Sequence, residues 1–146
     1  MRIPPEVVIK STIRPGSVFY FVEPSFTSKE PHCFVVVNNN PHSDRILIMV
    51  CATSKVDKRK LYVSLNRLPF ETLVEVNPSE CSFLTMPTVF DCNHPKKDSI
   101  ENLISRYEKG ELRLKDYIPS SILKRLQYGV IKSPLVDPAT KKIIQP

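Results

Sequence analysis

Two apolar runs in the first half of the chain constrain its fold more than any other feature. Residues 33–37 (CFVVV) and 46–51 (ILIMVC) contain no polar side chain other than a thiol. Runs of this length without alternation are typical of strands that are covered on both faces of a sheet. Residues 38–45 between them are rich in Asn, Pro, Ser and Asp, which favour turns. The pattern therefore predicts a hairpin of two central strands.

Further short strands are predicted on either side of this hairpin. They have the β-branched, aromatic or alternating character that strands favour, and they are residues 17–22, 61–63, 73–76 and 88–91. Pro15-Gly16 and Pro24 bracket the first of them. Fourteen prolines in the chain favour short strands and rigid turns over long helices. Five or six short strands at this spacing predict a small, strongly bent sheet or barrel.

The pattern changes to a helical one after residue 97. Asp98 and Glu101 have the spacing of a capping box, and Gly110 is a natural stop. An apolar stripe at helical spacing lies between them, formed by Ile100, Leu103, Ile104 and Tyr107. A second helix is expected to begin at Pro119 and to end before Pro134, with a loosely tethered loop after it. The predicted organisation is a mainly β (α+β) chain with a barrel domain over residues 1–97 and a C-terminal helical extension over residues 98–146.

Composition excludes several classes of protein. The chain has 146 residues and a formal net charge of +6, with 41% hydrophobic and 25% charged residues, as in ordinary soluble globular proteins. No apolar run reaches the roughly 18 residues of a membrane span, and the first residues lack a signal-peptide core, so a cytoplasmic protein without membrane contact is expected. Three glycines argue against Gly-rich phosphate loops, and hence against P-loop and Rossmann enzymes.

The four cysteines are expected to be structural thiols. None forms a Cys-x-x-Cys pair, and Cys33 and Cys51 lie within the apolar runs. A zinc site with Cys92 and His94 lacks further ligands at a recognisable spacing. We therefore expect no metal, no cofactor and no disulfide framework.

Three segments carry residues with reactive chemistry. Residues 29–38 form a polar loop that leads through His32 into a predicted buried strand. Residues 50–55 end another strand with Thr53 and Ser54, and residues 91–97 contain His94 beside two lysines. The basic cluster 55–60 lies between the second and third of these segments, and it is either a solvated loop or a phosphate-binding patch. Single histidines and strand-end hydroxyls more often have structural roles; the aromatic rings of Tyr20, Phe21 and Phe34 are expected in the core.

The order and spacing of these segments resemble the MazF/PemK family of toxin ribonucleases. Residues 14–21 (RPGSVFYF) are similar to the first strand of that family, and residues 31–37 (PHCFVVV) to the segment that leads into its second strand. Residues 51–54 (CATS) are similar to the family's Pro-Ile-Thr-Ser turn, and residues 93–96 (NHPK) to its Asp-Gln-x-Arg element. The resemblance covers roughly residues 14–97.

This resemblance implies a small SH3-like barrel of five to six strands, often dimeric, that cleaves single-stranded RNA without a metal and is neutralised by a protein antitoxin. The chain departs from the family at three positions. The Arg before the second strand is absent, with His32 and Lys29 as the nearest substitutes. Asn93 and Lys96 stand where the family has Asp and Arg, and an ammonium does not replace a bidentate guanidinium at a phosphate.

Metal-free RNA cleavage needs a base for the 2′-OH, an acid for the 5′-oxygen and donors to the charged phosphorane. His32 and His94 are the candidate acid and base, because imidazole titrates near neutral pH. Thr53 and Ser54 are candidate donors to a phosphate oxygen. The cations expected to bind nucleic acid are Lys29, Lys55, Lys58, Arg59, Lys60, Lys96 and Lys97.

Two alternatives to an endoribonuclease remain open at this point. The first is a catalytically degenerate small-barrel module that binds nucleic acid or a protein partner, and the missing Arg is its main support. The second is a structural scaffold. The apolar stripes over residues 100–107 and 122–130 either pack on the barrel or form a homodimer interface.

Overall fold

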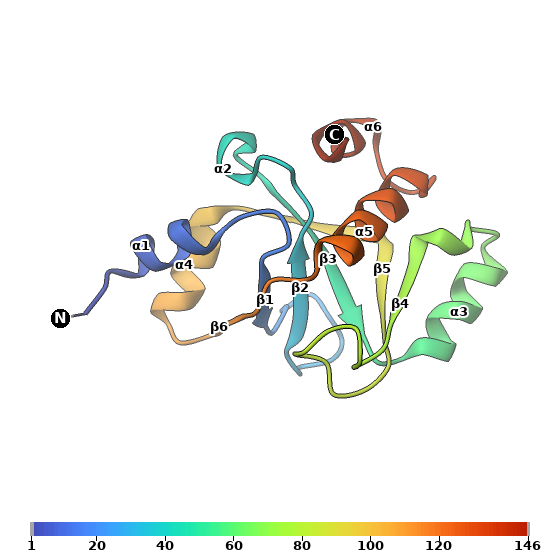
Figure 1. Ribbon diagram of the computed structural model, residues 1–146, viewed down its shortest axis with the longest axis horizontal. Coiled ribbons are helices and arrows are strands. Elements are labelled where there is room, and N and C mark those ends of the chain that lie inside the picture. Colours follow the sequence, from blue (N-terminus) through green and yellow to red (C-terminus); the bar gives the residue numbers. More distant parts are fainter. Residues whose placement is uncertain (1, 146) are drawn as a thin grey trace.

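Six strands form a single antiparallel sheet in the order β4-β5-β3-β2-β1-β6 (Figure 1). The strands are β1 (Val18–Phe21), β2 (His32–Val36), β3 (Leu47–Thr53), β4 (Leu73–Val76), β5 (Thr88–Asp98) and β6 (Leu112–Lys115). The computed structural model describes residues 2–145. The fold is α+β, and the predicted number of strands is confirmed. The sheet is open, with β4 and β6 at its two edges, so the expected SH3-like barrel is not confirmed.

More helices surround the sheet than the two that were expected at the C-terminus. They are α1 (Pro5–Thr12), α2 (Pro41–Asp44), α3 (Val56–Leu65), α4 (Ile100–Glu108), α5 (Ser120–Lys132) and α6 (Pro138–Ile144), with a 3-10 turn η1 (Phe70–Thr72) before β4. The predicted helices correspond to α4 and α5. The strand predicted at residues 61–63 was wrong, because these residues belong to α3. The loop expected after Pro134 was also wrong, because α6 lies there and buries Ile144 completely.

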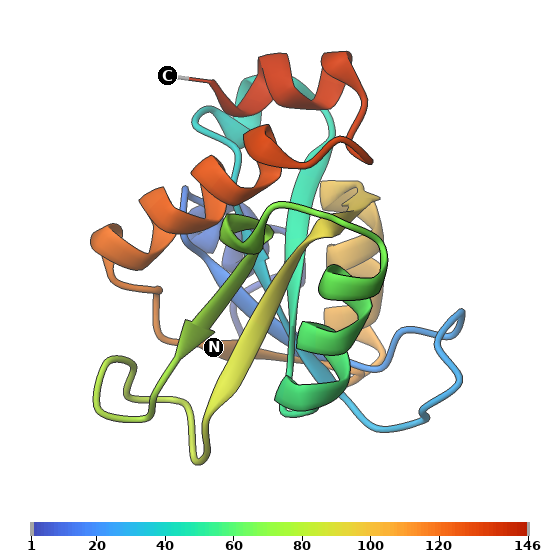
Figure 2. The ribbon, with the colours of Figure 1, turned by 90° about the vertical axis from the view of Figure 1, so that its right-hand side faces the viewer.

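Apolar side chains cover the sheet on both faces, as the unbroken runs in β2 and β3 predicted. On one face, which we call the α5 face, Val35 and Val50 pack with Ile122, Leu126 and Val130 of α5. Figure 2 shows α5 and α6 on this side and α3 and α4 on the other. The opposite face, which we call the α4 face, has its own core, formed by α1, α4 and the strand residues Phe19, Phe21, Phe34, Val36, Leu47 and Met49.

The connection between β2 and β3 is held by one buried amide. Asn38 is fully buried; its Oδ1 accepts from the backbone N of Ile48 at 2.7 Å, and its Nδ2 donates to the carbonyl of Ile46 and to the Asp44 carboxylate. The Asn- and Pro-rich turn that the sequence predicted contains the short helix α2. Arg45 ends this helix in the left-handed region, with a φ of 62°.

A bulge divides the long strand β5. Asp91 pairs with Cys51 on one side of it, and Lys96 pairs with Met49 on the other. Three extra residues of β5 are therefore accommodated opposite a single residue of β3. The side chains between Asp91 and Lys96, including His94, lie where the regular ladder is interrupted.

The segment after residue 97 contributes to the sheet as well as to its covering. β6 pairs with β1, with Tyr20 opposite Arg113 and Val18 opposite Lys115. Leu103 of α4 and Leu126 of α5 are fully buried on opposite faces of the sheet. The two apolar stripes of the C-terminal helices therefore pack on this chain's own sheet. Among the described residues, no helix is both long and apolar enough to cross a lipid bilayer.

Candidate functional site

A groove of about 1030 Å³ runs across the end of the sheet where β2 begins and β3 ends. We call it the strand-end groove. Two loops form its outer walls, residues 22–31 between β1 and β2 and residues 77–87 between β4 and β5. Figure 2 shows these loops at the same end of the sheet but on opposite sides of it. The floor comes from β1, β2, β3, β5 and β6, and the N-terminal part of α3 forms one flank.

All four side chains that the sequence proposed for catalysis line this groove: His32, Thr53, Ser54 and His94. They come from the start of β2, the end of β3 and the interrupted part of β5. Three of the predicted cations also line the groove, namely Lys55, Lys58 and Arg59. These seven residues come from segments that are up to 62 positions apart in the sequence (from His32 to His94).

The register of the strands explains why His32 and Thr53 meet. Phe34 of β2 pairs with Cys51 of β3, so continuing the antiparallel register by two residues sets His32 opposite Thr53. Residues two apart share a face, so these side chains lie with Cys51 on the α4 face. Asp91, which pairs with Cys51, lies on the same face. Strand spacing separates the backbones of β2 and β5 by about 10 Å, with β3 between them.

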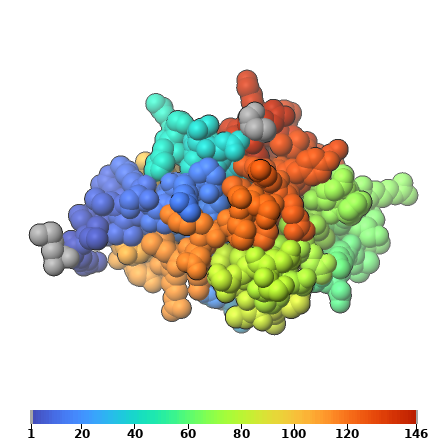
Figure 3. Space-filling model, viewed as in Figure 1, coloured from blue at the N-terminus to red at the C-terminus, as the bar shows by residue number. Residues whose placement is uncertain are grey.

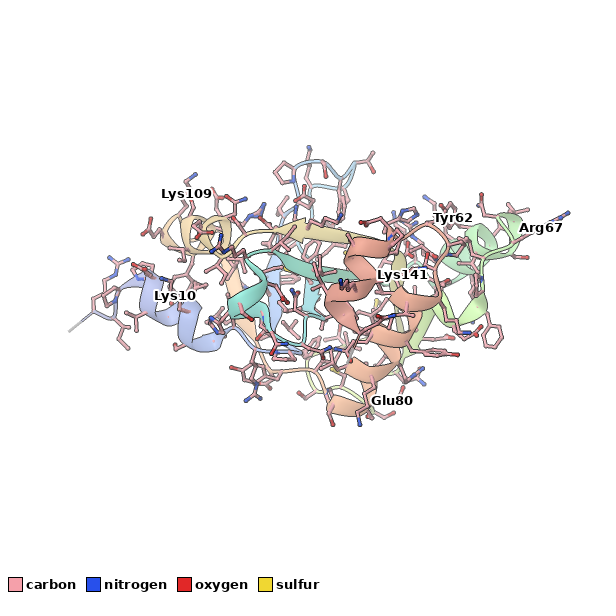
Figure 4. The ribbon with its side chains drawn as sticks, turned by 90° about the horizontal axis from the view of Figure 1, so that it is seen from above. Lys10, Tyr62, Arg67, Glu80, Lys109 and Lys141 are labelled. Carbon is pink, nitrogen blue, oxygen red and sulfur yellow. The ribbon has the colours of Figure 1, made fainter. Side chains whose placement is uncertain are left out.

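His94 is held by a chain of contacts from α3. The Tyr62 hydroxyl and His94 Nε2 are 3.0 Å apart. Arg59, one turn earlier on the same face of α3, lies over the Tyr62 ring at 6.0 Å and 3.6 Å from the Asp91 carboxylate. The Tyr62 contact uses Nε2, and His94 itself lines the groove. We call Asp91, Arg59, Tyr62 and His94 the His94 cluster (Tyr62 is labelled in Figure 4).

His32 lies against the wall formed by residues 22–31. Its ring meets Phe26 edge to face, with ring centres 5.4 Å apart. Its Nδ1 is buried and has no hydrogen-bond partner among the described residues. A buried ring nitrogen without a partner costs free energy. His32 therefore retains unused hydrogen-bonding capacity beside the groove.

The Thr53 hydroxyl takes part in the turn that leads into α3. Its oxygen accepts from the backbone N of Lys55 at 3.2 Å. This contact is the structural role that strand-end hydroxyls commonly have. Because Thr53 is the acceptor in it, its O–H remains able to donate to a ligand in the groove. Ser54 follows it in the turn and is exposed.

Four predicted cations do not line the groove: Lys29, Lys60, Lys96 and Lys97. Lys60 pairs with Glu75 at 3.0 Å, and Lys97 pairs with Asp137 at 3.2 Å. Both pairs are exposed, so they contribute little to stability.

Lys96 belongs to a half-buried ionic cluster on the α4 face. Its Nζ lies 2.6 Å from the Glu23 carboxylate and 3.8 Å from that of Asp98, and Arg106 approaches the same two carboxylates. Burial opposes ionisation of Glu23, but hydrogen bonds from Lys96 and Ser25 outweigh it and lower the pKa of Glu23 to about 2. Glu23 is the second residue of the wall loop 22–31, so this cluster fixes that wall to β5 and α4.

The cysteines near the groove are neutral at physiological pH. Burial raises the pKa of the Cys51 thiol to about 12 and also raises that of Cys33. Cys92 lies on the α5 face, where its Sγ approaches the carbonyl of Leu126 at 3.5 Å, while His94 contacts Tyr62. Across residues 2–145, no three His, Cys, Asp or Glu side chains gather closely enough to hold a metal ion.

The structure adds groove residues that the sequence did not indicate. Arg113 and Lys115 come from β6, which was not predicted, and Tyr62 was placed on a strand rather than on α3. Tyr20 was expected in the core but lines the groove, whereas Phe21 and Phe34 are buried as expected.

The groove is cationic overall. Five basic side chains line it (Lys55, Lys58, Arg59, Arg113 and Lys115) against two acidic ones (Glu30 and Asp91). Together with two imidazoles and two hydroxyls, this set can bind an anionic chain and transfer protons at a phosphate.

A scan against protein-family models gave no match to the chain, and a search of curated proteins found no significant similarity.

Proposed function

We propose that this chain is an endoribonuclease that binds single-stranded RNA in the strand-end groove and cleaves it without a metal. The observation that carries the proposal is the convergence of His32, Thr53, Ser54 and His94 on one cationic groove. The chemistry of these residues and the resemblance to the toxin family single them out, and they come from three separate segments of the sequence. A structural role for each of them would not require that they share a groove.

The reaction begins when one imidazole removes the proton of a ribose 2′-OH. The 2′-oxygen attacks the adjacent phosphorus, the bond from phosphorus to the 5′-oxygen breaks, and the other imidazole protonates that oxygen. The products are a 2′,3′-cyclic phosphate and a free 5′-hydroxyl. His32 and His94 take the two proton-transfer roles, and Thr53 and Ser54 donate to the phosphate oxygens.

Arg59 supplies the positive charge at the phosphorane in this proposal. The resemblance to the MazF/PemK family assigns that role to Lys96, but Lys96 is engaged with Glu23 at 2.6 Å. Arg59 lines the groove, is half-buried, and is oriented by Asp91 at 3.6 Å. A guanidinium presents paired donors to a phosphate, which an ammonium does not.

The resemblance also supports a biological setting. The protein would act in the cytoplasm as the toxin of a toxin–antitoxin pair, and a protein antitoxin would cover the groove. An acidic segment of such a partner would be attracted to the five cations of the groove.

A second candidate is a module that binds RNA without cleaving it. Two observations favour it: the Thr53 oxygen is used within a turn, and Lys96 is used within an ionic cluster. In this candidate function, RNA binds in the same cationic groove, but His32 and His94 transfer no proton.

The test is cleavage of an unstructured RNA in EDTA by the wild-type chain and by His32→Gln and His94→Gln. Each variant is expected to lower the cleavage rate by about 10²-fold or more, because it removes one proton-transfer group. Binding of a non-cleavable 2′-O-methyl RNA should stay within about twofold of wild type.

The third histidine of the chain provides the matched control. His42 is exposed, contacts the carbonyl of Ile13 and does not line the groove, so His42→Gln should cleave like wild type. A wild-type chain that binds RNA without cleaving it would establish the binding module instead. A chain that neither binds nor cleaves RNA would contradict both candidates.

A further inference from the structure

The strand-end groove continues past the ends of β2 and β3 onto the other face of the sheet. Cys51 lines it from the α4 face, while Cys33, which also lines it, packs with the core of the α5 face. The proposed chemistry uses only the half on the α4 face, with His32, Thr53 and the His94 cluster. The half on the α5 face, which we call the β6 half, has no role in that chemistry.

The β6 half is built by the register between β1 and β6. Tyr20 pairs with Cys33 on one side and with Arg113 on the other, so all three side chains lie on the α5 face. Lys115 is two residues further along β6 and lies on the same face, with its Nζ 5.0 Å from the centre of the Tyr20 ring. Two cations and a partly exposed aromatic residue thus lie side by side.

The second wall loop closes this half. Phe83 and Met86 of residues 77–87 line the groove here, and Met86 is 52% exposed. The Ser82 hydroxyl donates to the Asp116 carboxylate at 3.5 Å, which ties the loop to the residue that follows β6. In the space-filling view, this loop lies beside the segment after residue 110 along the lower edge of the molecule (Figure 3).

The charged residues that line the β6 half are all basic. The two carboxylates of the groove, Glu30 and Asp91, belong to the other half, one on the wall loop 22–31 and one on β5. Aromatic rings interleaved with cations are the pattern by which proteins bind single strands, because bases stack on the rings and phosphates meet the cations. An acidic peptide would use the cations but would leave Tyr20 and Phe83 without a partner of matching shape.

We propose that the β6 half is a second nucleotide-binding site, which takes the part of a single-stranded RNA that flanks the scissile phosphate. This inference rests on the proposed function. Thr53 on β3 and Arg113 on β6 are three strand spacings apart, about 14 Å, so one phosphate cannot contact both. The C-terminal segment thereby extends the RNA site beyond the part of the chain that resembles the toxin family.

Fluorescence anisotropy with two non-cleavable 2′-O-methyl RNAs, a dinucleotide and a dodecanucleotide, tests this site. Arg113→Gln combined with Lys115→Gln is expected to weaken binding of the dodecanucleotide about tenfold and to lower its salt slope by about 1.4, since two phosphate contacts are lost. Binding of the dinucleotide, which has a single phosphate and reaches only the half of the groove on the α4 face, should change by less than about twofold. The control is Lys109→Gln, an exposed cation before β6 that does not line the groove and lies at the opposite end of the molecule from Tyr62 (Figure 4).

The outcomes separate this inference from the proposed function. If wild type cleaves RNA and the double variant binds the dodecanucleotide as tightly as wild type, the inference is wrong and the nuclease stands. A Glu-rich peptide serves as a third probe in the same assay. If the double variant loses affinity for this peptide but not for the RNA, the β6 half binds an acidic protein segment, and the inference is wrong in that case as well. If wild type binds no RNA, both fail. If circular dichroism shows that the double variant is unfolded, the single variant Arg113→Gln replaces it, because Arg113 is exposed on the edge strand. The expected change in the salt slope of dodecanucleotide binding is then half as large.

Discussion

Glu23 shows how a single buried carboxylate fixes one wall of the groove. Its side chain is 8% exposed and accepts hydrogen bonds from the backbone N and the hydroxyl of Ser25, in addition to its contact with Lys96. Ser25 and Phe26 belong to the wall loop, and Phe26 contacts His32. The ionised form of Glu23 therefore links the loop to the ionic cluster and, through Phe26, to a proposed catalytic imidazole.

This link predicts how stability depends on pH. The pKa of Glu23 is about 2 in the folded chain against an ordinary value of 4.5, so its contribution is complete above pH 4.5 and is lost as the pH falls toward 2. The difference in free energy of unfolding between wild type and Glu23→Gln should shrink by on the order of 3 kcal/mol across that window. Urea unfolding at several pH values measures it. Glu108→Gln, at an exposed position of α4, should show no such trend, and a pH-independent difference for Glu23→Gln would contradict the assignment.

Single residues were predicted from the sequence where their chemistry was visible and missed where a partner decided their role. His32, Thr53 and His94 were selected for what they can do, and all three line the groove. Lys96 was selected for its charge, but its partner Glu23, and Arg106 that pairs with the same carboxylate, come from segments on either side of it in the sequence. No local pattern around Lys96 indicates that these groups gather there.

At the scale of elements, α5 depends on a close approach at Gly129. A Cβ added there would lie 2.8 Å from both Cys92 Sγ on β5 and the backbone carbonyl of Glu71 in η1. The carbonyl belongs to the main chain, so α5 would have to move away from the sheet. The α5 helix covers the α5 face of the sheet, and the β6 half of the groove lies on the same face.

Gly129→Ala is therefore expected to destabilise the fold by about 1–3 kcal/mol, because overpacking outweighs the gain in helix propensity of about 0.5–1 kcal/mol. The midpoint of urea unfolding, with an unchanged slope, is the measurement. Ser121→Ala, an exposed substitution on the same helix, should change stability by less than about 0.5 kcal/mol. A Gly129→Ala chain more stable than wild type would show that the helix can shift at no cost.

The elements that the sequence predicted are those with a strong local signal. Strands β1 to β4 have apolar runs or alternation between turn-forming residues, and they lie where the sequence predicted them. The strand predicted at residues 88–91 covers only the start of β5, which continues to Asp98 beyond the bulge. α3 was missed because its apolar stripe is narrow: Val63 is buried, but Leu61 and Leu65 are 59% and 73% exposed. β6 was missed because four residues of alternating Leu and basic character become a strand only by pairing with β1.

At the scale of the whole molecule, whether the sheet closes depends on contacts that no local pattern contains. Short strands at close spacing fit a barrel and an open sheet equally well, and the difference lies in which strands pair at the edges. Here β6 occupies the free side of β1, and α5 and α4 cover the two faces. The same arrangement brings Arg113 and Lys115 to the groove from the C-terminal part of the chain.

This architecture predicts that residues 1–97 do not fold as an independent barrel domain. Without the rest of the chain, β1 loses its pairing with β6, one face loses Ile122, Leu126 and Val130, and the other loses Leu103. The burial of these four large side chains, which contributes about 1.5–3 kcal/mol each, is lost, and this removes most of the stability of a small domain. A fragment of residues 1–97 should therefore give the amide NMR spectrum of an unfolded chain. The control is a chain that ends at residue 137, which keeps β6 and α5 and should fold with a lowered melting temperature. A dispersed amide spectrum and a cooperative unfolding transition from the 1–97 fragment would contradict the prediction, because they would show that residues 1–97 fold without the C-terminal segment.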